Sequence, residues 1–155
     1  MELKTQVHAE DGKQEIFITR EFDLPLELLF RAYTEPEIVE QWMGTKVLKM
    51  ENKKHGGYEL QMSDPSGKIL FAANGVIHDF IPNQKLVRTF EMTNAPVGIQ
   101  MEIHTFERLT DDTSKLTVHT IYESVAQRDQ TIQFGMRPGV SMAHDRLEAV
   151  AGKLK

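Results

Sequence analysis

Hydrophobic residues near the end of the chain recur at the spacing of one face of a helix. From residue 136 onward they are separated by three, four or one positions, at Met136, Val140, Ala143, Leu147, Val150, Ala151 and Leu154. Pro138 fits the first turn of a helix that begins near Arg137, and Gly135 separates this helix from a short one at residues 126–134 that Ser124 caps. Burying seven such side chains would stabilise the fold by on the order of 10 kcal/mol before the cost in conformational entropy is subtracted. The pattern predicts a one-sided sheet as the packing partner of the long helix.

The middle of the chain alternates hydrophobic and polar residues with a period of two, which is typical of half-buried strands. Six strands joined by short turns are predicted, at residues 47–51, 58–62, 69–81, 85–93, 99–109 and 115–123. Short turns make consecutive strands antiparallel. A first strand at residues 14–22 brings the predicted sheet to seven strands, after a loosely paired lead-in over residues 1–13. Gly75 interrupts the longest strand and predicts a bulge or a bend.

Two short helices are predicted between the first strand and the others. Asp23 is expected to cap the first, which Pro25 opens and which runs over residues 25–33. The second begins at Thr34-Glu35-Pro36-Glu37, which has the spacing of a capping box, and ends at Gly44.

This order of elements resembles the helix-grip fold of the SRPBCC (START-like) superfamily. The segments that narrow the resemblance are Ile18-Thr19-Arg20-Glu21-Phe22-Asp23, Leu29-Phe30-Arg31-Ala32-Tyr33-Thr34-Glu35-Pro36-Glu37, Gln41-Trp42-Met43-Gly44, Gly135-Met136, Gly139 and Asp145-Arg146-Leu147. They look like the activator-of-heat-shock-ATPase-homologue (AHSA-type) branch, and the likeness covers nearly the whole chain. It implies an α+β fold in which a curved seven-stranded antiparallel sheet wraps around the C-terminal helix and leaves a cavity beside it.

Three positions depart from that branch. Met43 and Thr45 stand where the family commonly has a second tryptophan and a proline, and Val140 stands where it commonly has a tryptophan. Smaller or more pliable apolar groups at Met43 and Val140 suit a pocket that adapts to its contents.

The cavity that the resemblance implies would be mostly apolar, as small-molecule sites usually are. The apolar candidates for its lining are Trp42, Met43, Tyr58, Leu60, Phe71, Phe90, Phe134, Met136, Val140 and Ala143. Each of them also fits as an ordinary core residue, and the eight methionines fit both uses.

The polar candidates come from the hairpin between the last two predicted strands. Closing it over the polar turn places His104 opposite Thr120, Glu102 opposite Tyr122 and Phe106 opposite Val118. If Phe106 faces inward, alternation turns His104, Thr120 and Tyr122 inward too. A histidine and a glutamate two positions apart on a concave face could perform acid–base chemistry. A register slipped by one residue would instead put His104 in water.

Composition excludes several classes of site. The 155 residues are 40% hydrophobic and 26% charged, which fits one globular domain over residues 1–155. The net charge of −5 and the lack of a basic cluster argue against a nucleic-acid partner. Without cysteine, the chain has no disulfide, thiolate metal site or cysteine nucleophile.

No metal or cofactor is expected, because the six histidines show no ligand spacing. His144 and Glu148, four residues apart on the predicted helix, are expected to form a surface pair. No stretch resembles a secretory leader or a membrane span, so we expect a cytoplasmic protein.

Three hypotheses of function follow. The first is binding of a hydrophobic or amphipathic small molecule, lipid-like or aromatic, between the sheet and the C-terminal helix. The second, from the superfamily, is a polyketide cyclase/dehydratase-like enzyme that uses His104, although no assembled catalytic set is visible. The third is a chaperone-ATPase-activator-like interaction protein, by analogy with the name of the branch. In each case the sequence does not decide whether the chain forms a homodimer.

Overall fold

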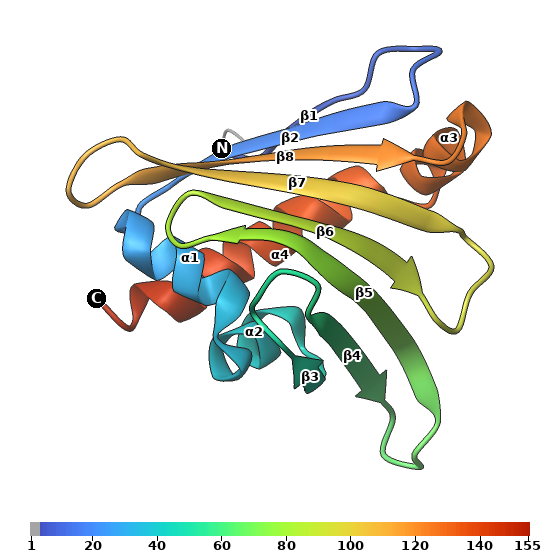
Figure 1. Ribbon diagram of the computed structural model, residues 1–155, viewed down its shortest axis with the longest axis horizontal. Coiled ribbons are helices and arrows are strands. Elements are labelled where there is room, and N and C mark those ends of the chain that lie inside the picture. The colour runs from blue at the N-terminus through green and yellow to red at the C-terminus, as the bar shows by residue number, and fades with distance from the viewer. Residues whose placement is uncertain (1–3) are drawn as a thin grey trace.

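The computed structural model describes residues 4–155, which form one antiparallel sheet and four helices (Figure 1). The strands are β1 (Gln6–His8), β2 (Glu15–Phe22), β3 (Lys46–Met50), β4 (Gly57–Ser63), β5 (Ile69–Ile81), β6 (Lys85–Met92), β7 (Ile99–Arg108) and β8 (Ser114–Tyr122). The helices are α1 (Leu26–Thr34), α2 (Pro36–Met43), α3 (Val125–Gln133) and α4 (Met136–Gly152). The predicted α+β helix-grip architecture is confirmed.

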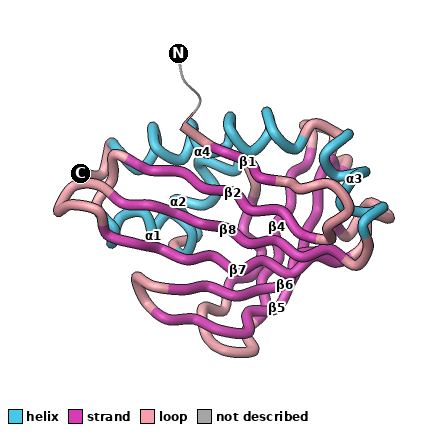
Figure 2. The backbone as a smooth tube through the Cα atoms, turned by 90° about the horizontal axis from the view of Figure 1, so that it is seen from above, coloured by secondary structure: helices cyan, strands magenta, loops and turns pink. Residues whose placement is uncertain are grey.

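The sheet order is β1-β2-β8-β7-β6-β5-β4-β3, so the first part of the chain lies beside its last strand. The sheet curves, and α4 runs along its concave side (Figures 1 and 2). Helices α1 and α2 pack against one another and against α4 at one end of that side. Their apolar side chains join those of β4, β6, β7 and β8 in one core cluster, to which α4 contributes Leu147 and Ala151.

The predicted number of seven strands is wrong by one, because residues 6–8 form a strand. β1 is antiparallel to β2 with Val7 opposite Ile18, and the turn between the two strands contains Gly12, which has a φ of 80°. Three residues are too few for a period of two to be visible in the sequence. Residues 1–3 of the predicted lead-in lie outside the described part of the chain.

The helix ends were predicted in part. Gly44 is left-handed at the end of α2, and the Ser124 hydroxyl accepts a hydrogen bond from the first turn of α3, as expected. The predicted caps at Asp23 and Thr34 are wrong. The N-cap of α1 is Pro25, without a side-chain cap bond, and Thr34 belongs to the last turn of α1, where its hydroxyl donates to a carbonyl of the preceding turn.

The hydrophobic stripe of α4 divides into two halves. Leu147 and Ala151 are completely buried, whereas Leu154 lies beyond the helix and is 48% exposed. The half-buried members of the stripe are Met136, Val140, Ala143 and Val150. The condition that all seven side chains are buried is therefore not met, because Met136, Val140 and Ala143 line a cavity and Leu154 is exposed.

Within residues 4–155, no helix has both the length and the apolar composition that crossing a membrane would require.

Candidate functional site

A cavity of about 450 Å³ lies between the concave face of the sheet and α4. Side chains from β2, α1, α2, β6, β7, β8, α3 and α4 line it, so it brings together segments that are far apart in the sequence. Most of these side chains are apolar, and the charged ones come from neighbouring positions on β6 and β7. The volume lies within the range of small-molecule sites, roughly 300 to 1,000 Å³.

Most of the side chains predicted to bind a ligand lie around this cavity. Those that line it are Trp42, Met43, Phe90, His104, Thr120, Tyr122, Phe134, Met136, Val140 and Ala143. Tyr58, Leu60 and Phe71 do not line it: the first two are buried in the core, and Phe71 packs against the core. The core cluster beneath α1 and α2 fills the concave side over β4, which leaves no opening to these positions.

The inward register of the β7–β8 hairpin is confirmed, although the partners differ by two residues. Glu102 lies opposite Thr120 and His104 opposite Val118, because the loop both begins and ends one residue earlier than predicted, which pairs Arg108 with Ser114. A shift of two preserves the face of every side chain, whereas a shift of one would have reversed it.

A buried ion pair lies at the polar end of the cavity. Arg88 and Glu102 are cross-strand partners on β6 and β7, and the Nε atom of Arg88 donates to Oε1 of Glu102 at 3.2 Å. The second oxygen of Glu102 accepts from the side-chain amide of Gln100 at 2.9 Å. Burial alone would raise the pKa of Glu102, but the Arg88 cation and these hydrogen bonds lower it, so the carboxylate is ionised.

The Arg88 guanidinium is supported from the other side by Tyr58. Its central carbon lies 4.7 Å from the centre of the Tyr58 ring, and the Tyr58 hydroxyl donates to the carbonyl of Thr89 at 2.5 Å. Gly75 makes room for this arrangement, because a Cβ atom there would collide with the Thr89 carbonyl and come within 2.6 Å of the Tyr58 ring. The irregularity of β5 falls slightly later than Gly75 itself, where the register shifts between residues 77 and 79.

His104 is buried beside this pair. Burial and the Arg88 cation together lower its pKa to about 4, and the Glu102 carboxylate at 3.8 Å from Nε2 only partly opposes the shift. The imidazole is therefore neutral near pH 7. Its Nδ1 atom is enclosed and has no hydrogen-bond partner among residues 4–155.

The predicted position of His144 at the surface is wrong. His144 lies at the cavity and not at the surface, and its Nδ1 atom shares a hydrogen bond of 3.0 Å with the hydroxyl of Thr5. Burial and the Arg20 cation lower its pKa to about 4. The predicted surface pair with Glu148 is wrong, because Glu148 instead accepts a 2.6 Å hydrogen bond from Arg20.

Arg88 was not among the predicted site residues. It occupies the position between Leu86 and Phe90 on β6, so period-two alternation places it on their inward face. His144 likewise lies four residues after Val140 and three before Leu147, on the stripe of α4. In both cases the periodicity of the pattern predicts an inward position, whereas the charged or polar type of the residue favours exposure to solvent.

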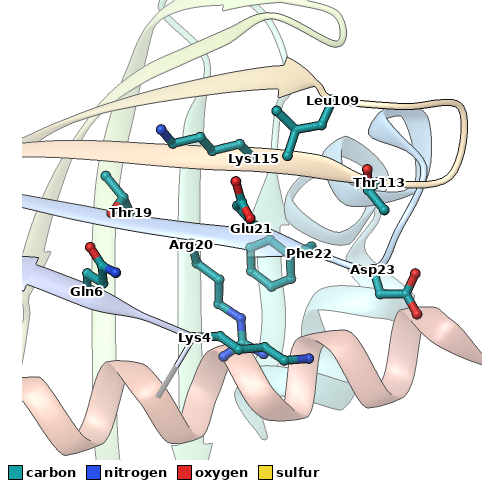
Figure 3. A pocket seen from close by; sticks show the side chains of 10 residues that line it. All are labelled: Lys4, Gln6, Thr19, Arg20, Glu21, Phe22, Asp23, Leu109, Thr113 and Lys115. Carbon is teal, nitrogen blue, oxygen red and sulfur yellow. The ribbon is translucent and has the colours of Figure 1, made fainter. Parts of the chain in front are cut away.

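A second hollow, of about 560 Å³, lies on the other side of β2 near the β7–β8 turn (Figure 3). Its lining is strongly polar and includes Lys4, Glu21 and Lys115. The side chain of Arg20 extends from β2 toward α4, where it donates to Asp145 at 2.7 Å as well as to Glu148. This guanidinium therefore ties β2 to α4, and the hollow is a less suitable binding site than the cavity.

No metal centre is formed within residues 4–155, because no three histidine, aspartate or glutamate side chains are grouped to hold an ion.

Residues 23–152 match the family described as Activator of Hsp90 ATPase homolog 1-like protein. A search of curated protein sequences returned no significant match.

Several solved structures share the fold. A protein from Arthrobacter aurescens has a TM-score of 0.85 at 18% identity, with 96% of this chain and 91% of that chain covered. A protein from Rhodobacter sphaeroides has a TM-score of 0.84 at 17% identity, with coverage of 96% and 99%. A protein from Mycobacterium smegmatis has a TM-score of 0.82 at 20% identity, with coverage of 94% and 95%. At these identities the likeness concerns the fold alone.

Proposed function

Since this chain belongs to the family of Activator of Hsp90 ATPase homolog 1-like proteins, whose fold places a helix against a curved sheet, we propose that it binds a hydrophobic or amphipathic small molecule between the two. The observation that carries the proposal is the cavity beside α4, which has an apolar lining and a polar cluster at one end. A lipid-like chain or an aromatic ring would contact the apolar part, and its polar end would lie near Arg88 and His104.

The mouth of the cavity gives further support. Phe134, at the junction of α3 and α4, lines the cavity and is nevertheless 75% exposed. A large aromatic side chain in water is unfavourable, and an apolar ligand that covered it would remove that cost.

Trp42 provides a direct assay, because it is the only tryptophan of the chain and lies at the cavity wall. Its indole nitrogen is fixed by a 2.7 Å hydrogen bond to the carbonyl of Ala32, so the ring has a defined position. Titration with decan-1-ol and with 2-naphthol should shift the emission of Trp42 and reach saturation.

The matched variants are Ala143→Phe, which fills the cavity, and Ala149→Phe, which adds the same ring on an exposed turn of α4. Ala143→Phe should abolish saturable binding, and Ala149→Phe should leave it unchanged. Saturable binding that survives Ala143→Phe at full affinity would refute the cavity as the site.

An enzymatic role for His104 is the second candidate, because His104 faces the cavity within 3.8 Å of Glu102. The geometry suits acid–base chemistry, but a pKa of about 4 makes the imidazole a weak base near pH 7. Burial and Glu102 also raise the pKa of Tyr122 to about 12, which keeps that phenol neutral. We therefore place binding ahead of catalysis. Loss of turnover of a bound ligand in a folded His104→Gln variant would reverse that order.

The family description also names an activator of the Hsp90 ATPase. That role would need a chaperone-facing surface, and the arrangement of the cavity neither requires nor supplies one. Stimulation of a purified Hsp90-type ATPase by this protein would support it.

A further inference from the structure

The cavity is electrically balanced. Arg88 and Glu102 are the only Arg, Lys, Asp or Glu side chains among the described residues that line it, and they form one ion pair. Its two histidines, His104 and His144, are both neutral near pH 7, because burial lowers each pKa to about 4. The side chains that line the cavity therefore carry one positive and one negative charge, and their sum is zero.

Glu102 and Arg88 differ in how much of their hydrogen-bonding capacity is satisfied within the protein. Glu102 has a hydrogen-bond donor on each oxygen, from Arg88 and from Gln100. Arg88 uses Nε for this bond, whereas its two terminal nitrogens donate to no atom of residues 4–155. A guanidinium that lines an apolar cavity with donors still free can bind an oxygen atom of a ligand.

We propose that the cavity selects neutral amphipathic molecules, whose buried polar group is a carbonyl or hydroxyl oxygen, over carboxylates of the same chain length. The inference rests on the proposed binding function and specifies its ligand class. A neutral oxygen accepts a hydrogen bond from Arg88 and leaves the cavity balanced. A carboxylate reaches the same nitrogens, but it places a second negative charge close to Glu102, whose side chain is only 13% exposed.

The test compares decan-1-ol with decanoate at a pH of about 8, where a carboxylic acid with a pKa near 4.5 is ionised. Dissociation constants are measured by calorimetry and by Trp42 fluorescence. The wild-type protein should bind decan-1-ol on the order of tenfold more tightly than decanoate, or more.

Glu102→Gln removes the negative charge and keeps the shape and the amide acceptor. Arg88 is then uncompensated, and the preference should shift by about tenfold or more toward decanoate. Glu107→Gln, at an exposed position on the same strand, is the matched control and should keep the wild-type ratio. Thermal melting of each variant shows that it is folded.

The outcomes are distinct. If wild-type protein binds decanoate as tightly as decan-1-ol or more tightly, the inference is overturned and the binding function stands. If folded Glu102→Gln keeps the wild-type ratio, charge balance is not the cause and the inference is overturned as well. If neither ligand binds, nor 2-naphthol, the proposed function itself fails. Because the wild-type ratio can overturn the inference by itself, the inference stays falsifiable even if the variant does not fold.

Discussion

Acidification from pH 7 to pH 5 should weaken the fold through two buried histidines. His104 and His144 have pKa values of about 4 in the folded chain, against an ordinary value of 6.5. The unfolded chain therefore takes up protons below pH 6.5 that the folded chain refuses until about pH 4. The contribution of each neutral histidine is complete above pH 6.5 and is lost progressively as the pH falls toward 4.

The size of the effect follows from the same values. At pH 5 each histidine should cost about 2 kcal/mol of unfolding free energy relative to pH 7, and the two together about 4 kcal/mol. This loss is a large fraction of the total free energy of unfolding of a typical protein, which is about 5 to 15 kcal/mol. Glu102 and Glu148 have lowered pKa values, so their own contributions are lost only below about pH 4.5, and the interval from 7 to 5 isolates the histidines.

The measurement is urea unfolding followed by Trp42 fluorescence at both pH values. Replacing His104 or His144 by glutamine should remove about half of the pH dependence each, whatever it does to stability at pH 7. His78→Gln, at an exposed histidine on β5, is the control and should leave the dependence intact. A loss of less than about 1 kcal/mol between pH 7 and pH 5 in the wild-type protein would contradict the reasoning.

Three further changes test the packing around the cavity. Leu147→Ala should lower the free energy of unfolding in urea by about 2 to 5 kcal/mol, because Leu147 is completely buried. Leu154→Ala, at an exposed position, should lower it by less than about 0.5 kcal/mol. Equal losses would show that α4 is not docked as described. Val140→Trp should fill the cavity and abolish the binding of decan-1-ol measured by calorimetry. It should also raise the melting temperature by roughly 2 to 6 °C. An unchanged affinity would show that the ligand binds elsewhere. Gly75→Ala should lower stability by more than about 1 kcal/mol, since the added methyl group displaces Tyr58; a neutral result in thermal unfolding would exclude close packing there.

The sequence specified the architecture well because its signals are local and repeated. Period-two alternation identified every strand of β2 to β8, and the stripe of α4 identified the helix that the sheet surrounds. The inward face of β7 and β8 was also predicted, because the observed register differs from the predicted one by two residues, and a shift of two preserves the face of every side chain. The exact partners of Glu102 and His104 depended on the position of the loop, which lies one residue earlier in the chain than predicted.

The polar end of the site was harder to predict for a different reason. Arg88 and His144 lie at inward positions of their periodic patterns, yet burial of such residues depends on partners that are distant in sequence. Arg88 needs Glu102 on the next strand and Tyr58 on β4, and His144 needs Thr5 beside β1. These pairings exist only after the fold has formed, so no local rule indicates them.

The pairing of β2 with β8 has a consequence for synthesis of the chain. It joins Glu15 to Ile121 and Phe22 to Ser114, so the first long strand acquires its neighbour about 100 residues later. At the usual pace of translation that is a wait of roughly 5 to 20 s, and α4, which covers the concave side, emerges later still. During this interval the apolar inner surface of the growing sheet faces water, which makes the nascent chain a natural client for chaperones and predicts slow folding for its size.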